Sequence, residues 1–463
     1  MTVDVRIHGG RVHLPSGPVT ADLLITGERI SGIVAPDDAT QAKQRIDATG
    51  KLVMPGIVDL HAHTRVPGYE YKEDFVTASQ AAAAGGITTF IDMPNVEPPT
   101  ETVKLLADVR KIAERDSLID WGHFASPSKP EEIAGLAAAG VTGFKMYQVS
   151  GGYPHDPRLA MGDPDKIYDA FERIAKTGLP ALVHPFSMPI FTHLSERAFA
   201  AGKPRNIVTF SEIYTKDVVW SAAVALLIEI QRQTGVRLHT VHTHSSESLR
   251  LIREAKAEGL RVTAAVDPKY FHLTHKDLAE QGARAIPGGF VTEDAKRLAV
   301  IWQAVNDGTI DIIDSDHAPH TLKDLERMEA DPWTGPFGAP HYDHELSLML
   351  TDVHTGKLSL GRLVQLFSEG SAKILGIYPK KGALLVGSDA DVVVVDEKRE
   401  VVPSDEKMYS KVKWTPYRGR RFVGAPVLTM LRGTVIAKDG VVTGRPGYGR
   451  YVAGVPQHSR TQE

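Results

Sequence analysis

The stretch GIVDLHAHTRVPG, residues 56–68, begins as an apolar run and ends with two histidines, His61 and His63, before a Pro-Gly turn. Side chains two residues apart in a β-strand point to the same face, so both imidazoles are directed to one point. Two neutral imidazoles side by side suit a divalent metal such as Zn²⁺. Because the chain has 19 histidines, one such pair is weak evidence alone, and other segments must supply further ligands.

Composition limits the classes of protein to consider. The 463-residue chain is 42% hydrophobic and 24% charged, as in ordinary soluble proteins. Its net charge of -4 argues against nucleic acid as a partner. The lack of cysteine excludes thiolate zinc sites and leaves histidine, aspartate and glutamate as ligands. No signal-peptide pattern is visible, and no apolar run approaches the roughly 18 residues of a membrane span, so we predict a cytoplasmic protein without membrane contact.

Apolar runs alternate with helix-like segments from residue 53 onwards. The runs are rich in valine and isoleucine, as in strands buried on both faces, and boundary signals such as Asp163-Pro164 and Gly178 mark the helices between them. Eight such runs predict an α/β fold, a (β/α)8 TIM barrel over residues 54–375. The predicted strands are 53–63, 87–92, 119–124, 141–147, 181–184, 237–242, 261–266 and 310–315.

Short β-like runs separated by glycine and proline turns occupy both ends of the chain. Each end is too small to enclose a core alone, so we predict that residues 1–53 and 376–463 pair into one composite β-sandwich beside the barrel. The predicted strands are 3–7, 10–13, 22–26, 29–34 and 51–53 at the N-terminal end, and 383–386, 392–396, 427–432 and 434–438 at the C-terminal end.

Active sites of TIM barrels lie at the C-terminal ends of the strands. A single histidine there is more often a hydrogen-bonded structural residue than a ligand. Joint placement at one barrel face is much harder to obtain by chance and predicts a metal centre. The residues at these strand ends are His61, His63, Lys145, His184, His239, His242, His244, Asp316, His317 and His320.

Lys145 and Asp316 have specific chemical interpretations. An ammonium group inside a cavity is costly, so Lys145 is either a snorkelling or salt-bridged lysine, or an amine of depressed pKa that reacts with CO₂. The resulting carbamate has two oxygens and can bridge two metal ions. Asp316 can bind metal, accept a proton from water and return it to a leaving nitrogen; its alternative role is to cap the following loop.

Five motifs together resemble those of the cyclic amidohydrolases of the amidohydrolase superfamily, which include dihydroorotases, hydantoinases and allantoinases. They are residues 59–68, AAAGGITT (82–89), MPN (93–95), DHAPH (316–320) and KVKWTPY (411–417), and the resemblance covers essentially the whole chain. The resemblance implies a barrel with a composite β-sandwich and a homo-oligomer, a dimer or a tetramer. It also implies a hydrolase that opens a cyclic amide or imide ring, with a metal-bridging hydroxide as nucleophile and Asp316 as general base and acid.

The same resemblance implies a binuclear centre, most simply of two Zn²⁺ ions. His61 and His63 would bind the first metal and Asp316 would complete its ligand set. Carboxylated Lys145 would bridge the two ions. His184 and a histidine of the sixth strand would bind the second. Spacing to the following helix favours His242 over His244, although a strand places both on one face.

Arg65, Asn95 and His320 match positions that hold the substrate carboxylate in dihydroorotases, and an arginine fork with an amide and an imidazole suits that task. Structural alternatives are an ion pair of Arg65 with Glu73 or Asp74, an Asx turn at Asn95 and a supporting role for His320.

Other segments depart from dihydroorotase: HPF (184–186), IPGGF (286–290) and PHYDHE (340–345), all expected to line the pocket. Ser150 stands where hydantoinases have a tyrosine. We therefore predict an intact metal site with altered ring recognition, for a small cyclic amide with or without a carboxylate. The alternatives are an acyclic amide or N-acyl hydrolase and a non-enzymatic relative.

Overall fold

The computed structural model describes residues 2–151, 156–286 and 294–458, and its centre is a barrel of parallel strands. The eight strands follow one another around the barrel in sequence order, which confirms the predicted fold class. They are β6 (Ile57–Ala62), β7 (Ile87–Asp92), β8 (Asp120–Ala125), β9 (Gly143–Tyr147), β10 (Pro180–His184), β11 (Arg237–Thr240), β12 (Val262–Val266) and β13 (Ile312–Ile313).

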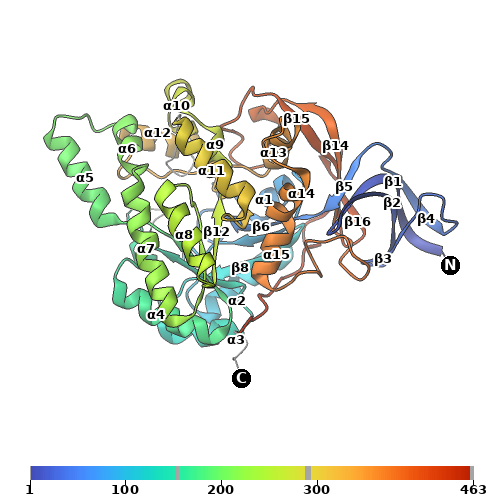
Figure 1. The fold of residues 1–463 in the computed structure, drawn as a ribbon, viewed down its shortest axis with the longest axis horizontal. Helices are drawn as coiled ribbons and strands as arrows, with labels where there is room; N and C mark the ends of the chain where they lie inside the picture. The colour runs from blue at the N-terminus through green and yellow to red at the C-terminus, as the bar shows by residue number, and fades with distance from the viewer. Residues whose placement is uncertain (1, 152–155, 287–293, 459–463) are drawn as a thin grey trace.

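Helices join consecutive strands and cover the outside of the barrel (Figure 1). Their ends follow local chemistry: the Asp74 side chain accepts from the Thr77 amide at the start of α1, and Gly178 ends α4 in a left-handed conformation, φ 69°. The helices are α1 (Phe75–Ala84), α2 (Val103–Asp116), α3 (Ile133–Ala138), α4 (Pro164–Thr177), α5 (Met188–Ala200), α6 (Ile207–Tyr214), α7 (Asp217–Thr234), α8 (Ser246–Ala257), α9 (Lys269–His272), α10 (His275–Gln281), α11 (Ala295–Asp307), α12 (Leu322–Ala330), α13 (Glu345–His354), α14 (Leu360–Val364) and α15 (Gly370–Leu375).

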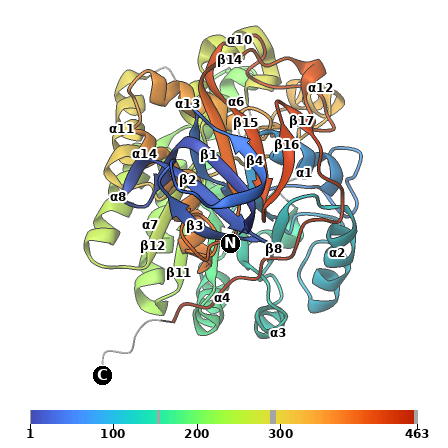
Figure 2. The same cartoon turned by 90° about the vertical axis from the view of Figure 1, so that its right-hand side faces the viewer.

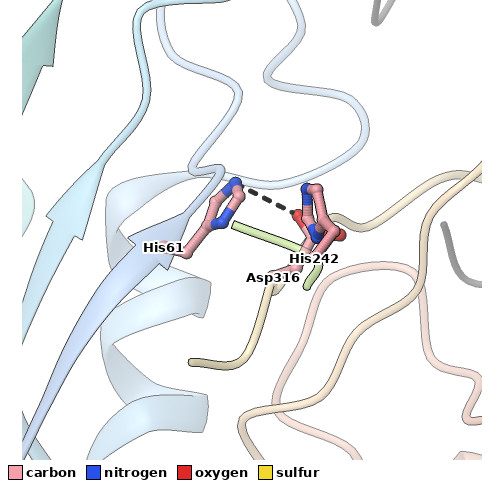
Figure 3. Close-up of side chains that lie close together, drawn as sticks. All are labelled: His61, His242 and Asp316. Atoms are coloured by element: carbon pink, nitrogen blue, oxygen red, sulfur yellow. Dashed lines mark ion pairs between the residues drawn. The ribbon is translucent and has the colours of Figure 1, made fainter. Parts of the chain in front are cut away.

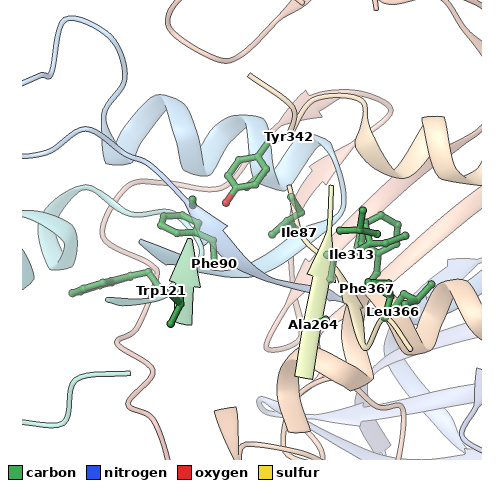
Figure 4. Packing of buried hydrophobic residues seen from close by; sticks show 14 of the residues in the cluster. Ile87, Phe90, Trp121, Ala264, Ile313, Tyr342, Leu366 and Phe367 are labelled. Atoms are coloured by element: carbon green, nitrogen blue, oxygen red, sulfur yellow. The ribbon is translucent and has the colours of Figure 1, made fainter. Parts of the chain in front are cut away.

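Apolar packing fills the space between the barrel strands and the covering helices. Phe90 and Trp121 on neighbouring strands lie with Tyr342 on one side of this core, and Leu366 and Phe367 lie on the other (Figure 4). Phe75 of α1 packs against both Phe90 and Trp121, with ring centroids 6.2 and 5.8 Å away. Within the described residues, no helix combines the length and apolarity that crossing a membrane requires.

The eighth strand is shorter than predicted, because the chain turns after Ile313. Side chains rather than a long ladder close the barrel here. The Asp59 carboxylate accepts hydrogen bonds from the Ser315 amide (2.9 Å) and the Tyr342 hydroxyl (2.7 Å). The His63 amide donates to the His317 carbonyl at 2.9 Å. This closure brings the end of β13 beside the histidines of β6.

The predicted strand 53–63 is wrong as a single element. It is two strands, β5 (Leu52–Pro55) in a second sheet and β6 in the barrel, and the chain passes between the sheets at Gly56. A β-carbon at Gly56 would lie 2.2 Å from the Thr88 hydroxyl, so only glycine allows this close crossing. A continuous apolar run cannot reveal such a change of sheet.

Both chain ends contribute to the second sheet, in which blue and orange-red strands lie side by side (Figure 2). The strand order is β17-β16-β15-β14-β5-β1-β2-β3, and β4 pairs with β1. The strands are β1 (Thr2–Leu14), β2 (Gly17–Thr26), β3 (Arg29–Val34), β4 (Gln41–Asp47), β14 (Val392–Val401), β15 (Phe422–Leu431), β16 (Thr434–Lys438) and β17 (Val441–Val442). The division of the chain at residues 53 and 376 stays a proposal.

Several details of this sheet differ from the prediction, including a longer β2 and the unpredicted β17. Segments 3–7 and 10–13 form one strand, β1, with an irregularity between Ile7 and Gly10. Residues 383–386 form turns rather than a strand, and Val386 is 64% exposed. The strand β4 was missed because its sequence, QAKQRID, is polar and mostly exposed, so it lacks the apolar alternation that identifies a strand.

A buried cluster of charges ties the second sheet to the barrel. The Lys381 ammonium lies 2.7 Å from Asp120 at the start of β8, 2.6 Å from Asp391 and 3.2 Å from Asp389. Arg432 also binds Asp120. Although the three carboxylates could in principle hold a metal, the Lys381 ammonium already lies among them, and the cluster therefore has a structural role.

The variant Lys381→Met should lower the free energy of unfolding by about 3–5 kcal/mol, because it leaves buried carboxylates without their cation. Urea denaturation followed by circular dichroism measures the change. The exposed neighbour Lys380→Met is the matched control and should change stability little. Equal stability of the two variants would show that the cluster does not hold the two parts together.

Candidate metal centre

Four predicted ligands converge at the C-terminal ends of the barrel strands. The Asp316 Oδ1 atom lies 3.2 Å from His63 Nε2 and 3.4 Å from His61 Nε2. Ligand atoms of His61, His242 and Asp316 all lie within 4.8 Å of one another, and Figure 3 shows these three side chains facing a common point. Such spacing suits joint coordination of a cation.

His184 extends this group on the far side. Its ring centroid lies 4.8 Å from that of His242, which in turn lies 5.0 Å from that of His61. The imidazoles of β6, β10 and the segment after β11 thus form a continuous row. In two-metal sites the ions lie about 3.5–4 Å apart, so a row of this length is compatible with a pair of ions.

Acceptors behind two of the histidines fix the direction of their rings. His63 Nδ1 lies 2.8 Å from Asn95 Oδ1, and His242 Nδ1 lies 2.8 Å from Asp267 Oδ2. His61 Nδ1 lies 3.4 Å from Asp314 Oδ2 but makes no hydrogen bond within the described residues. An N–H donated to such an acceptor leaves Nε2 as the lone pair that faces the centre, the arrangement typical of metal-binding histidines. Burial lowers the pKa of His63 to about 4, so its imidazole is neutral at pH 7.

The surroundings of Lys145 show whether a carboxylated lysine suits this site. Its side chain is fully buried, and its amine has no hydrogen-bond partner among the described residues. Burial lowers the pKa of Lys145 to about 8, so about a tenth of the amine is in the neutral form at pH 7, the form that reacts with CO₂. A buried amine without a partner is costly as it stands, and carboxylation would turn it into an anion facing cations. These residues therefore fit a metal pair.

Backbone conformation also distinguishes the centre. Arg65, His242 and Asp316 all have positive φ, at 66°, 56° and 44°. Residues other than glycine adopt this left-handed region rarely and at a cost, and such residues cluster at functional sites. At all three positions the chain has just left a barrel strand, so the strain directs each side chain toward the centre.

His244, the alternative ligand, faces elsewhere. Its ring stacks on Tyr270 at 4.4 Å between centroids and meets the edge of Trp220 at 4.4 Å. His242, in contrast, faces His61 and His184. Residues 242 and 244 follow the end of β11, so the alternation of a strand does not apply to them. The geometry favours His242.

Lys269 is a site residue that sequence reasoning missed. It is fully buried, and its Nζ atom lies 2.6 Å from Asp316 Oδ2 and 2.8 Å from Asp267 Oδ2. Burial alone would lower the pKa of Lys269, but the two carboxylates outweigh it and raise the pKa. Since Asp267 also binds His242, a continuous chain of contacts joins Asp316 to His242. The polar triplet DPK, residues 267–269, directly follows β12 and was the available signal.

The three predicted carboxylate-binding residues divide into two groups. Arg65 and Asn95 line the cavity at the metal centre. His320 lies behind Arg65: its Nε2 atom is 3.2 Å from Arg65 Nη2, and its Nδ1 atom is 3.0 Å from Lys72 Nζ. Because protein groups contact both ring nitrogens, His320 holds Arg65 in place. Aromatic residues complete the cavity lining and were not predicted: Tyr147, Tyr214, Tyr270 and Phe337.

The altered segments have different surroundings. Phe186 packs against Tyr214 and Trp220, with centroids 4.9 and 5.2 Å away, and supports the cavity wall. In the segment 340–345, the Tyr342 hydroxyl bonds Asp59 at the barrel seam, so this part of the segment supports the barrel. The described residues that line the cavity include none from 340–345, contrary to expectation. Residues 287–290 lie outside the described residues.

Beneath the centre, His239 should make stability depend on pH. Burial, together with the charge of Lys145, lowers the pKa of His239 to about 3. The unfolded chain binds a proton near pH 6.5 and the folded chain does not, so stability is fully present above pH 6.5 and falls as the pH drops toward 3. The variant His239→Gln should reduce this slope by up to about 1.4 kcal/mol per pH unit.

Urea denaturation of both proteins at pH 5, 6 and 7 measures that slope. The exposed His275→Gln is the control and should keep the wild-type slope. Parallel curves for wild type and His239→Gln would contradict the assignment, because they would mean that His239 binds its proton equally in both states.

Comparison with known proteins places this geometry in a family. The sequence pattern that defines the amidohydrolase family matches residues 52–436 of this chain. The chain belongs to the amidohydrolase family. This amidohydrolase is 32% identical to an L-hydantoinase from Paenarthrobacter aurescens over 97% of the chain and 98% of that protein. It is 33% identical to a dihydroorotase from Geotalea daltonii over 94% of the chain and all of that protein, 100%.

A solved structure is similar throughout. The L-hydantoinase (dihydropyrimidinase) from Arthrobacter aurescens superposes with a TM-score of 0.93 at 32% identity, covering 97% of this chain and 100% of that one. The family predicted from five motifs is therefore confirmed over nearly the whole chain. Relatives of different name are almost equally similar, so overall identity does not select a substrate.

Proposed function

We propose that this amidohydrolase hydrolyses a cyclic amide or imide with two divalent metal ions, most simply Zn²⁺. The observation that carries the proposal is the buried cluster of His61, His242 and Asp316, with the Lys145 amine near enough to act on His61 and without a hydrogen-bond partner among the described residues. The names of the similar proteins, L-hydantoinase and dihydroorotase, support a ring substrate.

In the proposed ligand set, His61, His63 and Asp316 hold one ion, His184 and His242 hold the other, and carboxylated Lys145 bridges them. When bound, the two ions supply an activated water and polarise the substrate carbonyl. The chain supplies part of the geometry for this through Asn95 and Asp267, which fix the imidazole rings of His63 and His242.

Asp316 carries the proton in the proposed reaction. It takes a proton from the attacking water as the new carbon–oxygen bond forms, and returns a proton to the ring nitrogen as the carbon–nitrogen bond breaks. The product is an open chain with a carboxylate at one end and the freed nitrogen at the other. Lys269 holds Oδ2 of Asp316, so that Oδ1 faces His61 and His63.

Arg65 and Asn95 are the proposed contacts for the substrate, and His320 supports Arg65. A guanidinium buried beside the metal centre suits either a substrate carboxylate or a polar ring edge. The aromatic side chains of Tyr147, Tyr214 and Phe337 form the rest of the wall and favour a flat ring. We also expect a cytoplasmic protein and, from the family resemblance, a homo-oligomer, either a dimer or a tetramer. Light scattering measures the oligomeric state.

A substrate panel tests the proposal. Purified protein should open at least one of dihydroorotate, 5-substituted hydantoins, dihydrouracil, allantoin, phthalimide and succinimide. Metal analysis of the same sample should find about two ions per chain. Open-chain N-acyl amino acids are the comparison: faster turnover of these than of every ring would identify an acyclic amide hydrolase. No turnover of either class by protein with two bound ions would contradict the proposal.

A further inference from the structure

A second cavity, of about 570 Å³, opens at the end of the barrel opposite the metal centre. It lies at the starts of β10 and β11 and beside residues that precede β12 and β13, whereas the predicted ligands follow the strand ends. Leu182, Val241 and Ala265 fill the barrel interior between the two levels. The cavity is thus separate from the proposed active site, and its size is that of ordinary small-molecule sites.

Three half-buried arginines line this cavity: Arg237, Arg261 and Arg362. In the described residues they bind main-chain carbonyls, and Arg362 also donates to the Gln365 side-chain amide oxygen; none of the three lies within ion-pairing distance of a carboxylate. A carbonyl satisfies an N–H donor but does not neutralise the charge. The guanidinium groups therefore keep their full positive charge inside a concave, partly desolvated space.

The two acids of the cavity compensate this charge only in part: Asp311 attracts Arg362, but each acid already has a lysine partner. Asp311 is bound to Lys256 at 2.6 Å, and Glu369 is paired with Lys373. Arg237 and Arg261 also stand at neighbouring starts of adjacent parallel strands. Burial and the charge of Arg261 lower the pKa of Arg237 to about 10, which reflects the cost of placing two cations together without an anion.

A short π-helical segment also forms part of the cavity wall. The segment η4 (Gln365–Glu369) is a π-helix, and both of its terminal residues line the wall. Short π-helical segments are rare and frequently occur at functional sites. This segment and the arginine cluster are independent features that meet at one cavity.

We propose that this cavity binds a small oxyanion with at least two negative charges, a phosphate or a dicarboxylate, through Arg237, Arg261 and Arg362. Planar guanidinium groups bind such oxygens with paired hydrogen bonds. The anion would also stabilise the closed end of the barrel, because Arg261 holds the C-terminal segment at the Gln457 carbonyl and Arg237 bonds Ile374 at the end of α15.

Calorimetric titration of the purified, metal-loaded protein with inorganic phosphate and with succinate tests the proposal, in chloride of matched ionic strength. We expect saturable binding of at least one probe and a rise in melting temperature with its concentration. The probe that binds distinguishes a phosphate site from a dicarboxylate site. Arg261→Gln should weaken binding roughly tenfold, while ring-opening activity stays at the wild-type level.

Two further variants keep the test decisive. Arg362→Gln should weaken binding as much as Arg261→Gln, and it replaces that variant if Arg261→Gln does not fold. Arg65→Gln separates this cavity from the active site and should leave anion binding unchanged. The proposal is overturned if neither probe binds, if the cavity variants bind as tightly as wild type, or if only Arg65→Gln loses binding.

Discussion

Replacing Lys145 with alanine should reduce ring-opening activity by roughly 10³-fold or more, because the bridge between the proposed metal ions is lost. Metal ions stabilise developing charge by several kcal/mol, and each 1.36 kcal/mol corresponds to a factor of ten in rate. The side chain is fully buried, in the middle of β9. The initial rate on the best substrate of the panel measures the loss.

Metal content and chemical rescue separate this role from a structural one. The bound metal should fall from about two ions per chain to one or fewer. Added formate, acetate or propionate should restore part of the activity by supplying the missing carboxylate oxygens, and should do so in Lys145→Ala but not in the bulkier Lys145→Arg. The exposed Lys166→Ala on α4 is the matched control. Full activity of Lys145→Ala would refute the carbamate.

The sequence sufficed for the barrel because its strands are buried on both faces and read as continuous apolar runs. Sequence patterns did not predict the strand boundaries that depend on contacts between residues far apart in the chain. The change of sheet at Gly56 depends on the nearby Thr88 side chain, and the short β13 depends on Asp59, more than 250 residues away. The polar β4 gains its place only by pairing with β1.

The residues of the candidate site likewise fall into those that the sequence predicted and those that only the folded structure shows. Ligand positions could be predicted because strand ends meet at one barrel face whatever the details of packing. Lys269 was missed, since its place in a polar triplet after β12 is only a weak signal, and its role becomes clear when the fold brings Asp316 within 2.6 Å. The supporting role of His320 likewise depends on Lys72, which approaches from another loop.

Asp316→Asn should lower kcat by about 10²–10⁴-fold, the usual contribution of a general base and acid, with a much smaller change in KM. The substitution keeps the shape of the side chain, so the folded structure should be preserved. Glu345→Gln is a matched control: it exchanges another buried carboxyl group for an amide, at a residue that does not line the cavity at the metal centre, so the variant should keep wild-type activity.

A double variant tests whether Lys269 acts through Asp316. If Lys269 acts by holding Asp316 Oδ2, Lys269→Met should lower activity in the wild-type background and should add little in Asp316→Asn, because the contact is already broken. Independent, multiplicative losses would instead mean that Lys269 acts without Asp316. Metal content of Lys269→Met gives a readout apart from turnover: a charge pair that orients a ligand should change metal affinity by about 10–100-fold. Unchanged affinity and unchanged activity would together show that the contact has no role in orienting the aspartate, although it lies at the centre of the site.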